Sequence, residues 1–156
     1  SFYAGLRACE IAALRVGDVF DEVGGVKDTI YLSSAQTKGS DSATVLVNSK
    51  LSKQLKKFGQ QYPTHMDDRT APLLFSAKGG GFTAQTIVNL FKRIYKLAGI
   101  DGASSHSGRR QFVTQLADRG INARLVQVLA RHKHLSTTQR YIDVNESKLR
   151  GAIELI

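Results

Sequence analysis

The stretch TAQTIVNLFKRIYKLAG, residues 83–99, carries the strongest secondary-structure signal in the chain. Its apolar residues recur at the spacing of one helix face, and polar residues occupy the opposite face. This pattern predicts an amphipathic helix that packs one side against a core. A glycine-rich loop, KGGG at 78–81, precedes it. The helix is the first indication of a mostly helical domain.

The chain that follows residues 83–99 also has helical periodicity. SHSGRRQFVTQLADRG at 105–120 predicts a helix that ends with Gly120 in the C′ position. ARLVQVLARH at 123–132 predicts another, with Asn122 as its N-cap. NESKLRGAIELI at 145–156 predicts a final helix. Its apolar face comprises Leu149, Ala152, Ile153 and Ile156.

The chain that precedes residues 83–99 adds a small sheet. Residues 19–47 are rich in β-branched side chains, with turn signals at 24–25 and 38–41, and predict about three antiparallel strands. On either side of this sheet, helices are predicted over residues 9–16 and 49–62. A polar loop is predicted over residues 63–72. The predicted fold class is mainly α with a small antiparallel β-sheet near the N-terminus (α+β), in one domain.

The composition narrows the range of functions. The chain has 156 residues and a net charge of +9, which favours a polyanionic partner, although a merely basic surface also fits. Cys9 is the only cysteine, so no intrachain disulfide can form, and a reducing cytosol suits it. No apolar run approaches the ~20 residues of a membrane span, and no signal peptide is visible. The opening SFYAGLR lacks an initiator Met, so we interpret the chain as part of a larger protein.

Several polar residues are not explained by the predicted helices and strands. Tyr141 lies in HLSTTQRYID, residues 134–143, where a core tyrosine would have apolar neighbours. This setting indicates a side chain presented to a partner. Other polar positions share this character: Arg7, Glu10, Lys38 at a hairpin tip, His106 and Arg109 at i and i+3, and His132 in RHKH. Each of these taken alone also occurs on ordinary protein surfaces.

Their order along the chain resembles that of the tyrosine site-specific recombinases, the phage integrase family. GLRACEIAALRVGDV is similar to the first arginine motif of that family. HSGRRQFVTQLADRG together with VQVLARHKHLSTTQRYIDV is similar to its second motif, through to the nucleophile. Two positions depart from the family pattern. Gly108 stands where the family commonly has Leu, and Arg131 stands where it commonly has Gly.

The resemblance implies the fold of a tyrosine recombinase catalytic domain over residues 1–156, without the core-binding domain that precedes it in the family. It also implies that Tyr141 attacks the scissile phosphate and forms a 3′-phosphotyrosyl bond. The implied supporting roles are phosphate binding by Arg7, Arg109 and His132, leaving-group protonation by Lys38, proton transfer by His106, and support of the arginines by Glu10. Candidate contacts to the DNA backbone are Arg110, Arg131 and Lys133.

These residue types suit phosphoryl transfer on chemical grounds. Guanidinium groups stay charged and offer paired donors to phosphate oxygens. A phenol with the ordinary pKa of about 10 needs nearby cations or a base to act as a nucleophile. No carboxylate cluster suited to two Mg²⁺ ions is visible, His65 is too isolated for a zinc site, and KGGG lacks the P-loop pattern. We therefore expect no metal and no cofactor.

The expected partner is double-stranded DNA, with self-association into a tetrameric synaptic complex on DNA. The isolated chain is expected to be mainly monomeric and not membrane-bound, in a cytoplasm of bacterial or phage origin where it acts on chromosomal DNA. The final helix docks either on its own domain or on a neighbouring protomer. Two alternatives remain open at this point. One is relaxation of DNA like a type IB topoisomerase, and the other is a DNA-binding module without catalysis.

Overall fold

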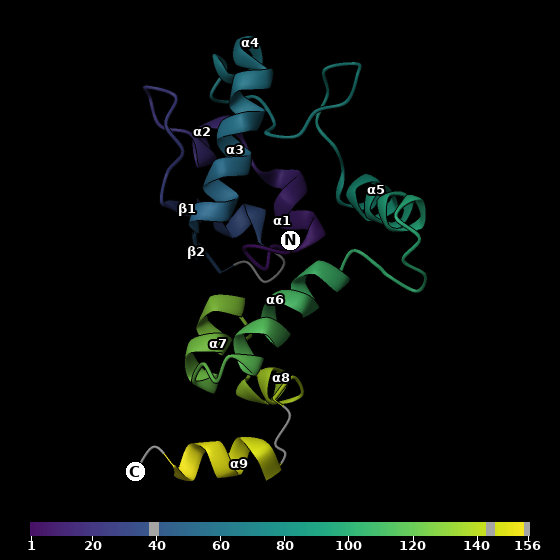
Figure 1. The fold of residues 1–156 in the computed structure, drawn as a ribbon. Coiled ribbons are helices and arrows are strands. Elements are labelled where there is room, and N and C mark those ends of the chain that lie inside the picture. The colour runs from purple at the N-terminus through teal and green to yellow at the C-terminus, as the bar shows by residue number, and fades with distance from the viewer. Residues whose placement is uncertain (38–40, 143–145, 155–156) are drawn as a thin grey trace. The chain divides into compact units, whose positions relative to one another are not determined.

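The computed structural model describes residues 1–37, 41–142 and 146–154. The chain separates into two compact units, Ser1–Phe112 and Val113–Ile156. Helices predominate in both units, and the first also contains a small antiparallel sheet (Figure 1). The predicted fold class is therefore confirmed. Within the described residues, every helix is too short or too polar to span a bilayer.

The first unit is built around the packing of α1 against α5. Its buried core includes Ile11 and Leu14, from α1 and the residue after it, and Ile87 of α5. The elements in order are α1 (Ala8–Ala13), α2 (Val16–Val19), β1 (Thr29–Leu32), the 3₁₀ helix η1 (Ser34–Gln36), β2 (Ala43–Leu46), α3 (Ser49–Gln61), α4 (Pro63–Met66) and α5 (Ala84–Leu97). The next helix, α6 (Ser107–Asp118), begins in this unit and continues into the second.

The sheet has two strands in the described residues, rather than the predicted three. β1 and β2 are antiparallel, with Ile30 opposite Val45 and both side chains buried. Where a third strand was predicted, residues 20–26 form a tight turn that is closed by a bridge between Phe20 and Val26. The Asp21 carboxylate accepts hydrogen bonds from the amides of Val23 and Gly25, which satisfies backbone donors locally instead of through a ladder.

The segment predicted as a polar loop, residues 63–72, begins with the short helix α4. Pro63 is its first residue, where a missing amide hydrogen costs nothing. The His65 ring stacks on Phe75 at 3.8 Å between centroids, and its Nε2 lies 2.8 Å from the Pro72 carbonyl oxygen. Further along, the hydroxyl and then the amide of Thr70 donate to Asp68, and these bonds lower the pKa of that carboxyl.

The second unit contains the end of α6 and three more helices: α7 (Ala123–Ala130), α8 (Leu135–Gln139) and α9 (Glu146–Ile153). Both predicted helix ends are confirmed. Gly120 has a φ of +73°, and Ile121 donates its amide hydrogen to the Leu116 carbonyl, as in a Schellman motif. The side chain of Asn122 accepts a hydrogen bond from the amide of Arg124 and caps α7.

A second Schellman motif ends α7, with Arg131 in the position that Gly120 occupies after α6. Arg131 has a φ of +56°, and no other non-glycine residue among those described has a positive φ. The amide of His132 donates to the Gln127 carbonyl at 3.0 Å and completes the motif. A left-handed backbone is what glycine adopts without steric cost, which explains physically why a glycine suits this position.

We predict that the left-handed backbone at residue 131 makes Arg131→Gly more stable than Arg131→Ala. Both variants lose the same side chain, so their difference isolates the cost of a Cβ atom at positive φ, about 1 kcal/mol. The glycine variant should unfold about 2–4 °C above the alanine variant in a thermal melt. Equal melting temperatures would show that the backbone at this position is not strained.

Candidate active site

The first arginine motif is organised by Glu10, which is fully buried near the start of α1. Its carboxylate accepts a hydrogen bond from the backbone amide of Arg7 at 2.8 Å and another from the Arg7 guanidinium at 2.7 Å. The contact to the amide is one half of a capping box, so the same carboxylate starts the helix and holds the arginine. The Arg7 side chain keeps about a quarter of its surface exposed, at 26%.

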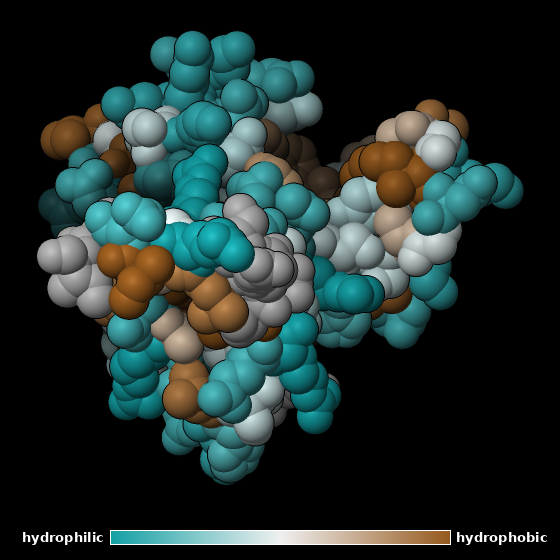
Figure 2. All heavy atoms as spheres, turned by 60° about the horizontal axis from the view of Figure 1, so that its bottom comes forward, coloured by the Kyte–Doolittle hydropathy of each residue, from teal (hydrophilic) through white to brown (hydrophobic). Residues whose placement is uncertain are grey.

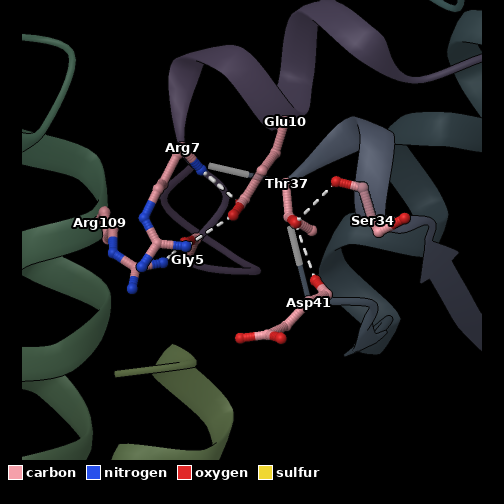
Figure 3. Close-up of polar contacts among 7 residues, drawn as sticks. All are labelled: Gly5, Arg7, Glu10, Ser34, Thr37, Asp41 and Arg109. Atoms are coloured by element: carbon pink, nitrogen blue, oxygen red, sulfur yellow. Dashed lines mark hydrogen bonds and ion pairs between the residues drawn. The ribbon is translucent and has the colours of Figure 1, made fainter. Parts of the chain in front are cut away.

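The second arginine motif contacts the loop before α1, which contains Gly5 and Arg7. Arg109 of α6 is buried, with 7% of its surface exposed, and its guanidinium donates a hydrogen bond to the Gly5 carbonyl. Gly5 lies two residues before Arg7. Figure 3 shows the two guanidinium groups approaching each other from α1 and α6, with Glu10 on the far side of Arg7. The structure thus brings together Arg7, Glu10 and Arg109.

Gly5 makes this approach possible because it has no side chain. Its φ is +58°, and a Cβ atom at this position would lie 2.8 Å from Cδ1 of Phe112. Phe112 follows Arg109 by one helical turn of α6, so both side chains meet the same glycine. The Gly5 carbonyl and the space beside its α-carbon together position the start of α6 against the loop before α1.

The remaining candidates in the first unit are less enclosed. His106 is exposed and immediately precedes α6, where its amide donates to the Ser104 hydroxyl at 3.3 Å. Arg110 is exposed, in keeping with a contact to a partner. Lys38 lies outside the described residues. Beside it in the chain, the Thr37 hydroxyl is within hydrogen-bond distance of the carbonyls of Ser34 and Asp41 (Figure 3).

In the second unit, His132 and Tyr141 lie next to each other. Their ring centroids are 6.2 Å apart and the ring planes are inclined by 25°. Both rings are half-buried. Thr138 of α8 contacts both residues: its hydroxyl lies 2.9 Å from Nδ1 of His132, and its carbonyl accepts the amide hydrogen of Tyr141 at 2.9 Å. The short helix α8 ends two residues before Tyr141.

Gln127 supports the loop that carries His132. This glutamine is buried on α7, and its side-chain amide donates to the His132 carbonyl at 3.0 Å. Its side-chain oxygen accepts a hydrogen bond from the guanidinium of Arg124 at 2.8 Å. Together with the Schellman motif, Gln127 holds His132 through both the amide and the carbonyl of its backbone. Lys133, the next residue, is exposed.

The candidate side chains were compared with the metal-binding clusters and pockets of the described residues. No three His, Cys, Asp or Glu side chains gather at a metal-binding distance within the part of the chain that the structure describes. Two surface pockets of about 730 and 680 Å³ lie in the first unit, lined in part by Arg15 and Tyr31 and by Asp21 and Lys56 respectively. None of the side chains that line them belongs to the predicted site.

The phage integrase family matches residues 1–148 of the chain. The chain belongs to this family. Among its relatives, the tyrosine recombinase XerD of Ralstonia nicotianae is 33% identical over 152 residues, which are 96% of this chain and 47% of that protein. The crystal structure of XerA recombinase matches with a TM-score of 0.76 and 26% identity, over 99% of this chain and 54% of that one. The Tn1549 transposon integrase, at 18% identity, shares the fold, with a TM-score of 0.75 over 99% of this chain and 56% of that one.

This phage integrase family chain spans about half the length of the curated relatives it matches. Its two departures from the family pattern have local explanations in the structure. Arg131 occupies the left-handed position after α7. At Gly108, a Cβ atom would lie 2.9 Å from the Ser1 hydroxyl and 3.2 Å from the amide nitrogen of Phe2, so a larger residue would displace the segment that packs there.

Three residues that hold the site were not predicted from the sequence: Gly5, Gln127 and Thr138. Gln127 left the clearest signal, because it is a single amide inside the apolar run LVQVLA on a helix whose buried face it shares. Thr138 precedes Tyr141 by three residues, the spacing of one turn. Gly5 gave no signal beyond its place before the first arginine, since its partner is 104 positions away.

We predict that Gly5→Ala is more destabilising than the same substitution at Gly24. Both glycines have positive φ, but nothing lies within 4 Å of a Cβ atom at Gly24. Gly24→Ala should lower the free energy of unfolding by about 1 kcal/mol, from the backbone alone. Gly5→Ala should cost about 1–3 kcal/mol more, because the new methyl group overlaps Phe112.

Denaturant titration of the two variants measures this difference. The double variant Gly5→Ala/Phe112→Leu should recover part of the loss, since the smaller side chain leaves room for the methyl group. Equal destabilisation at the two glycines would mean that Phe112 does not constrain the loop.

Proposed function

We propose that the protein cleaves and rejoins DNA strands in site-specific recombination or integration, through a covalent 3′-phosphotyrosyl intermediate on Tyr141. The observation that carries this proposal is the placement of Tyr141 beside His132, joined through Thr138, in a chain of the phage integrase family. When the phenol attacks a phosphate, the neighbouring imidazole can form a hydrogen bond to that phosphate. This pairing has no purpose in a module that only binds DNA.

In the proposed reaction, the Tyr141 oxygen forms a bond to phosphorus and loses its proton, and the bond to the 5′-oxygen breaks. Lys38 supplies the proton that the leaving 5′-oxygen needs, and His106 assists proton transfer at the tyrosine. Arg7 and Arg109 bind the non-bridging oxygens, where negative charge increases in the transition state. A preorganised donor of this kind typically accelerates such a step by roughly 10²–10³.

Two features of the first unit support these roles for the arginines. The carboxylate of Glu10 and the carbonyl of Gly5 each take one guanidinium hydrogen bond, so the arginines are oriented before any phosphate arrives. Guanidinium groups held in this way lose little conformational entropy on binding an anion. We propose that Glu10 is a positioning residue for Arg7 and has no direct part in the chemistry.

The proposed reaction needs neither a nucleotide cofactor nor a metal. One phosphodiester bond is exchanged for another at the tyrosine, so the energy of the cleaved bond is kept. A 5′-hydroxyl from another strand then attacks the phosphotyrosyl bond and releases Tyr141. The positive charges that the chemistry needs come from side chains of the chain itself.

The proposed partner is double-stranded DNA, which a net charge of +9 would attract. The Tn1549 transposon integrase, which shares the fold, was solved in complex with a circular intermediate DNA. Exposed Arg110 and Lys133, together with Arg131, are proposed to contact the DNA backbone. We propose that residues 1–156 form the catalytic domain of a longer recombinase, which acts in the cytoplasm on chromosomal DNA of a bacterium or phage.

The central prediction is that Tyr141→Phe binds DNA like the wild type but forms no covalent adduct, because only the hydroxyl is lost. The full-length protein should be incubated with a nicked suicide substrate, and the adduct detected by denaturing electrophoresis. Tyr31→Phe, a change at an exposed tyrosine, is the matched control and should leave the adduct intact. An adduct that persists without the Tyr141 hydroxyl would assign the nucleophile elsewhere. Relaxation of plasmids that lack a recombination site would favour a topoisomerase.

Assembly into a tetramer on DNA is proposed to involve α9. Leu149 and Ile153 expose 59% and 62% of their surface, and Ala152 is also exposed, whereas Ile156 lies outside the described residues. Figure 2 shows hydrophobic residues at the surface among hydrophilic ones. An apolar stripe of this kind requires a partner. We propose that it docks on a neighbouring protomer when the proteins assemble, and that the unassembled chain is mainly monomeric.

We predict that Leu149→Gln/Ile153→Gln leaves stability and binding to a single DNA site unchanged, because the replaced side chains are exposed in the chain itself. Cooperative binding to paired sites should weaken and recombination should fall. Leu46→Gln, at a residue that is 61% exposed on β2, is the control and should affect none of these properties. Mobility shifts on one and two sites, with a thermal melt, measure the effect. A lower melting temperature would place α9 on its own protomer.

A further inference from the structure

Thr138 occupies an unusual position for a hydroxyl-bearing side chain. It is fully buried, although the helix that carries it, α8, has only five residues and is otherwise half-buried or exposed. Its hydroxyl oxygen lies 2.9 Å from Nδ1 of His132. Its carbonyl accepts the amide hydrogen of Tyr141. One residue therefore connects the imidazole to the turn that carries the phenol.

The direction of the hydrogen bond between Thr138 and His132 follows from the burial of the hydroxyl. Among the described residues, Nδ1 of His132 is the one hydrogen-bond partner of this hydroxyl. If Nδ1 carried a proton and donated it, the hydroxyl proton of Thr138 would be buried without an acceptor. A buried polar group without a partner is costly, so the hydroxyl donates and Nδ1 accepts. In a neutral imidazole whose Nδ1 accepts, the proton is on Nε2.

We propose that Thr138 is a positioning residue that fixes His132 in the Nε2-protonated tautomer, so that the imidazole is a hydrogen-bond donor at Nε2. This inference rests on the proposed function, in which His132 donates a hydrogen bond to the scissile phosphate. A phosphate oxygen is only an acceptor. The opposite tautomer would present a lone pair at Nε2 and repel the phosphate instead of binding it.

The other contacts of His132 show what Thr138 adds. Gln127 and the Schellman motif hold the backbone of His132 and so position its α-carbon. These two contacts are made by the backbone of His132, and its ring is stacked on that of Tyr141. The Thr138 hydroxyl acts on the ring itself, at the nitrogen opposite the proposed donor. It also ties ring orientation to Tyr141, because the same residue accepts the tyrosine amide.

The decisive measurement is the protonation of the two His132 ring nitrogens. Full-length protein labelled with ¹⁵N-histidine is examined by long-range ¹H–¹⁵N correlation at a pH where the ring is neutral, and the signals are assigned by their loss in His132→Asn. The wild type should show Nε2 protonated and Nδ1 as an acceptor. Thr138→Val, which replaces the hydroxyl with a methyl group of similar size, should populate the Nδ1-protonated tautomer. Thr138→Ser keeps a hydroxyl and should restore the wild-type pattern.

Cleavage kinetics give the second readout. Thr138→Val should lower the single-turnover rate of adduct formation by about five- to tenfold, the effect of one lost hydrogen bond, with unchanged DNA affinity. Thr138→Ser should cleave near the wild-type rate. Thr137→Val makes the same chemical change one residue earlier, at a half-buried side chain, and should behave as the wild type.

Failure of this inference differs from failure of the proposed function. An Nδ1-protonated ring in the wild type, or an unchanged tautomer and rate in Thr138→Val, would overturn the role of Thr138 even if Tyr141 forms the adduct. Loss of DNA affinity in Thr138→Val and Thr138→Ser alike would also overturn it, since the threonine would then only support the fold. The absence of any Tyr141 adduct would refute the proposed function, whereas the ring protonation could still be measured.

Discussion

The hydrogen bond from the Arg109 guanidinium to the Gly5 carbonyl joins two motifs that are about a hundred residues apart in the chain. It depends on a left-handed backbone at Gly5 and on the space that Phe112 fills beside that glycine. Arg7 follows two residues later and is held by the buried carboxylate of Glu10. The placement of both guanidinium groups therefore depends on one short loop. A Cβ atom at position 5 would therefore disturb both guanidinium groups.

The second unit holds its functional side chains in a similar way. His132 follows a left-handed residue, Arg131, and is bound through its backbone to Gln127. Its ring is bound to Thr138, which also accepts the amide of Tyr141. In both units the candidate site residues make hydrogen bonds to backbone groups and to buried polar side chains.

Arg131 and Gly108 are two departures from the family pattern that lie close to the candidate site residues. At 131 the family commonly has glycine, and the backbone here keeps the conformation that glycine favours while it carries a long side chain. At 108 the family commonly has leucine, and here a Cβ atom would meet the Ser1 side chain and the backbone nitrogen of Phe2.

The sequence by itself determined the features that depend on neighbours within a few residues. Helical periodicity predicted α5 and α7, and cap chemistry predicted Asn122 and Gly120, because these interactions span one or two turns. The order of the polar residues was sufficient to recognise the family. Tertiary structure alone decided that the partners of Arg109 and His132 are Gly5 and Thr138. These partners depend on which buried hydrogen-bond donors and acceptors come together in the folded chain. The local periodicity of the sequence does not predict such pairs.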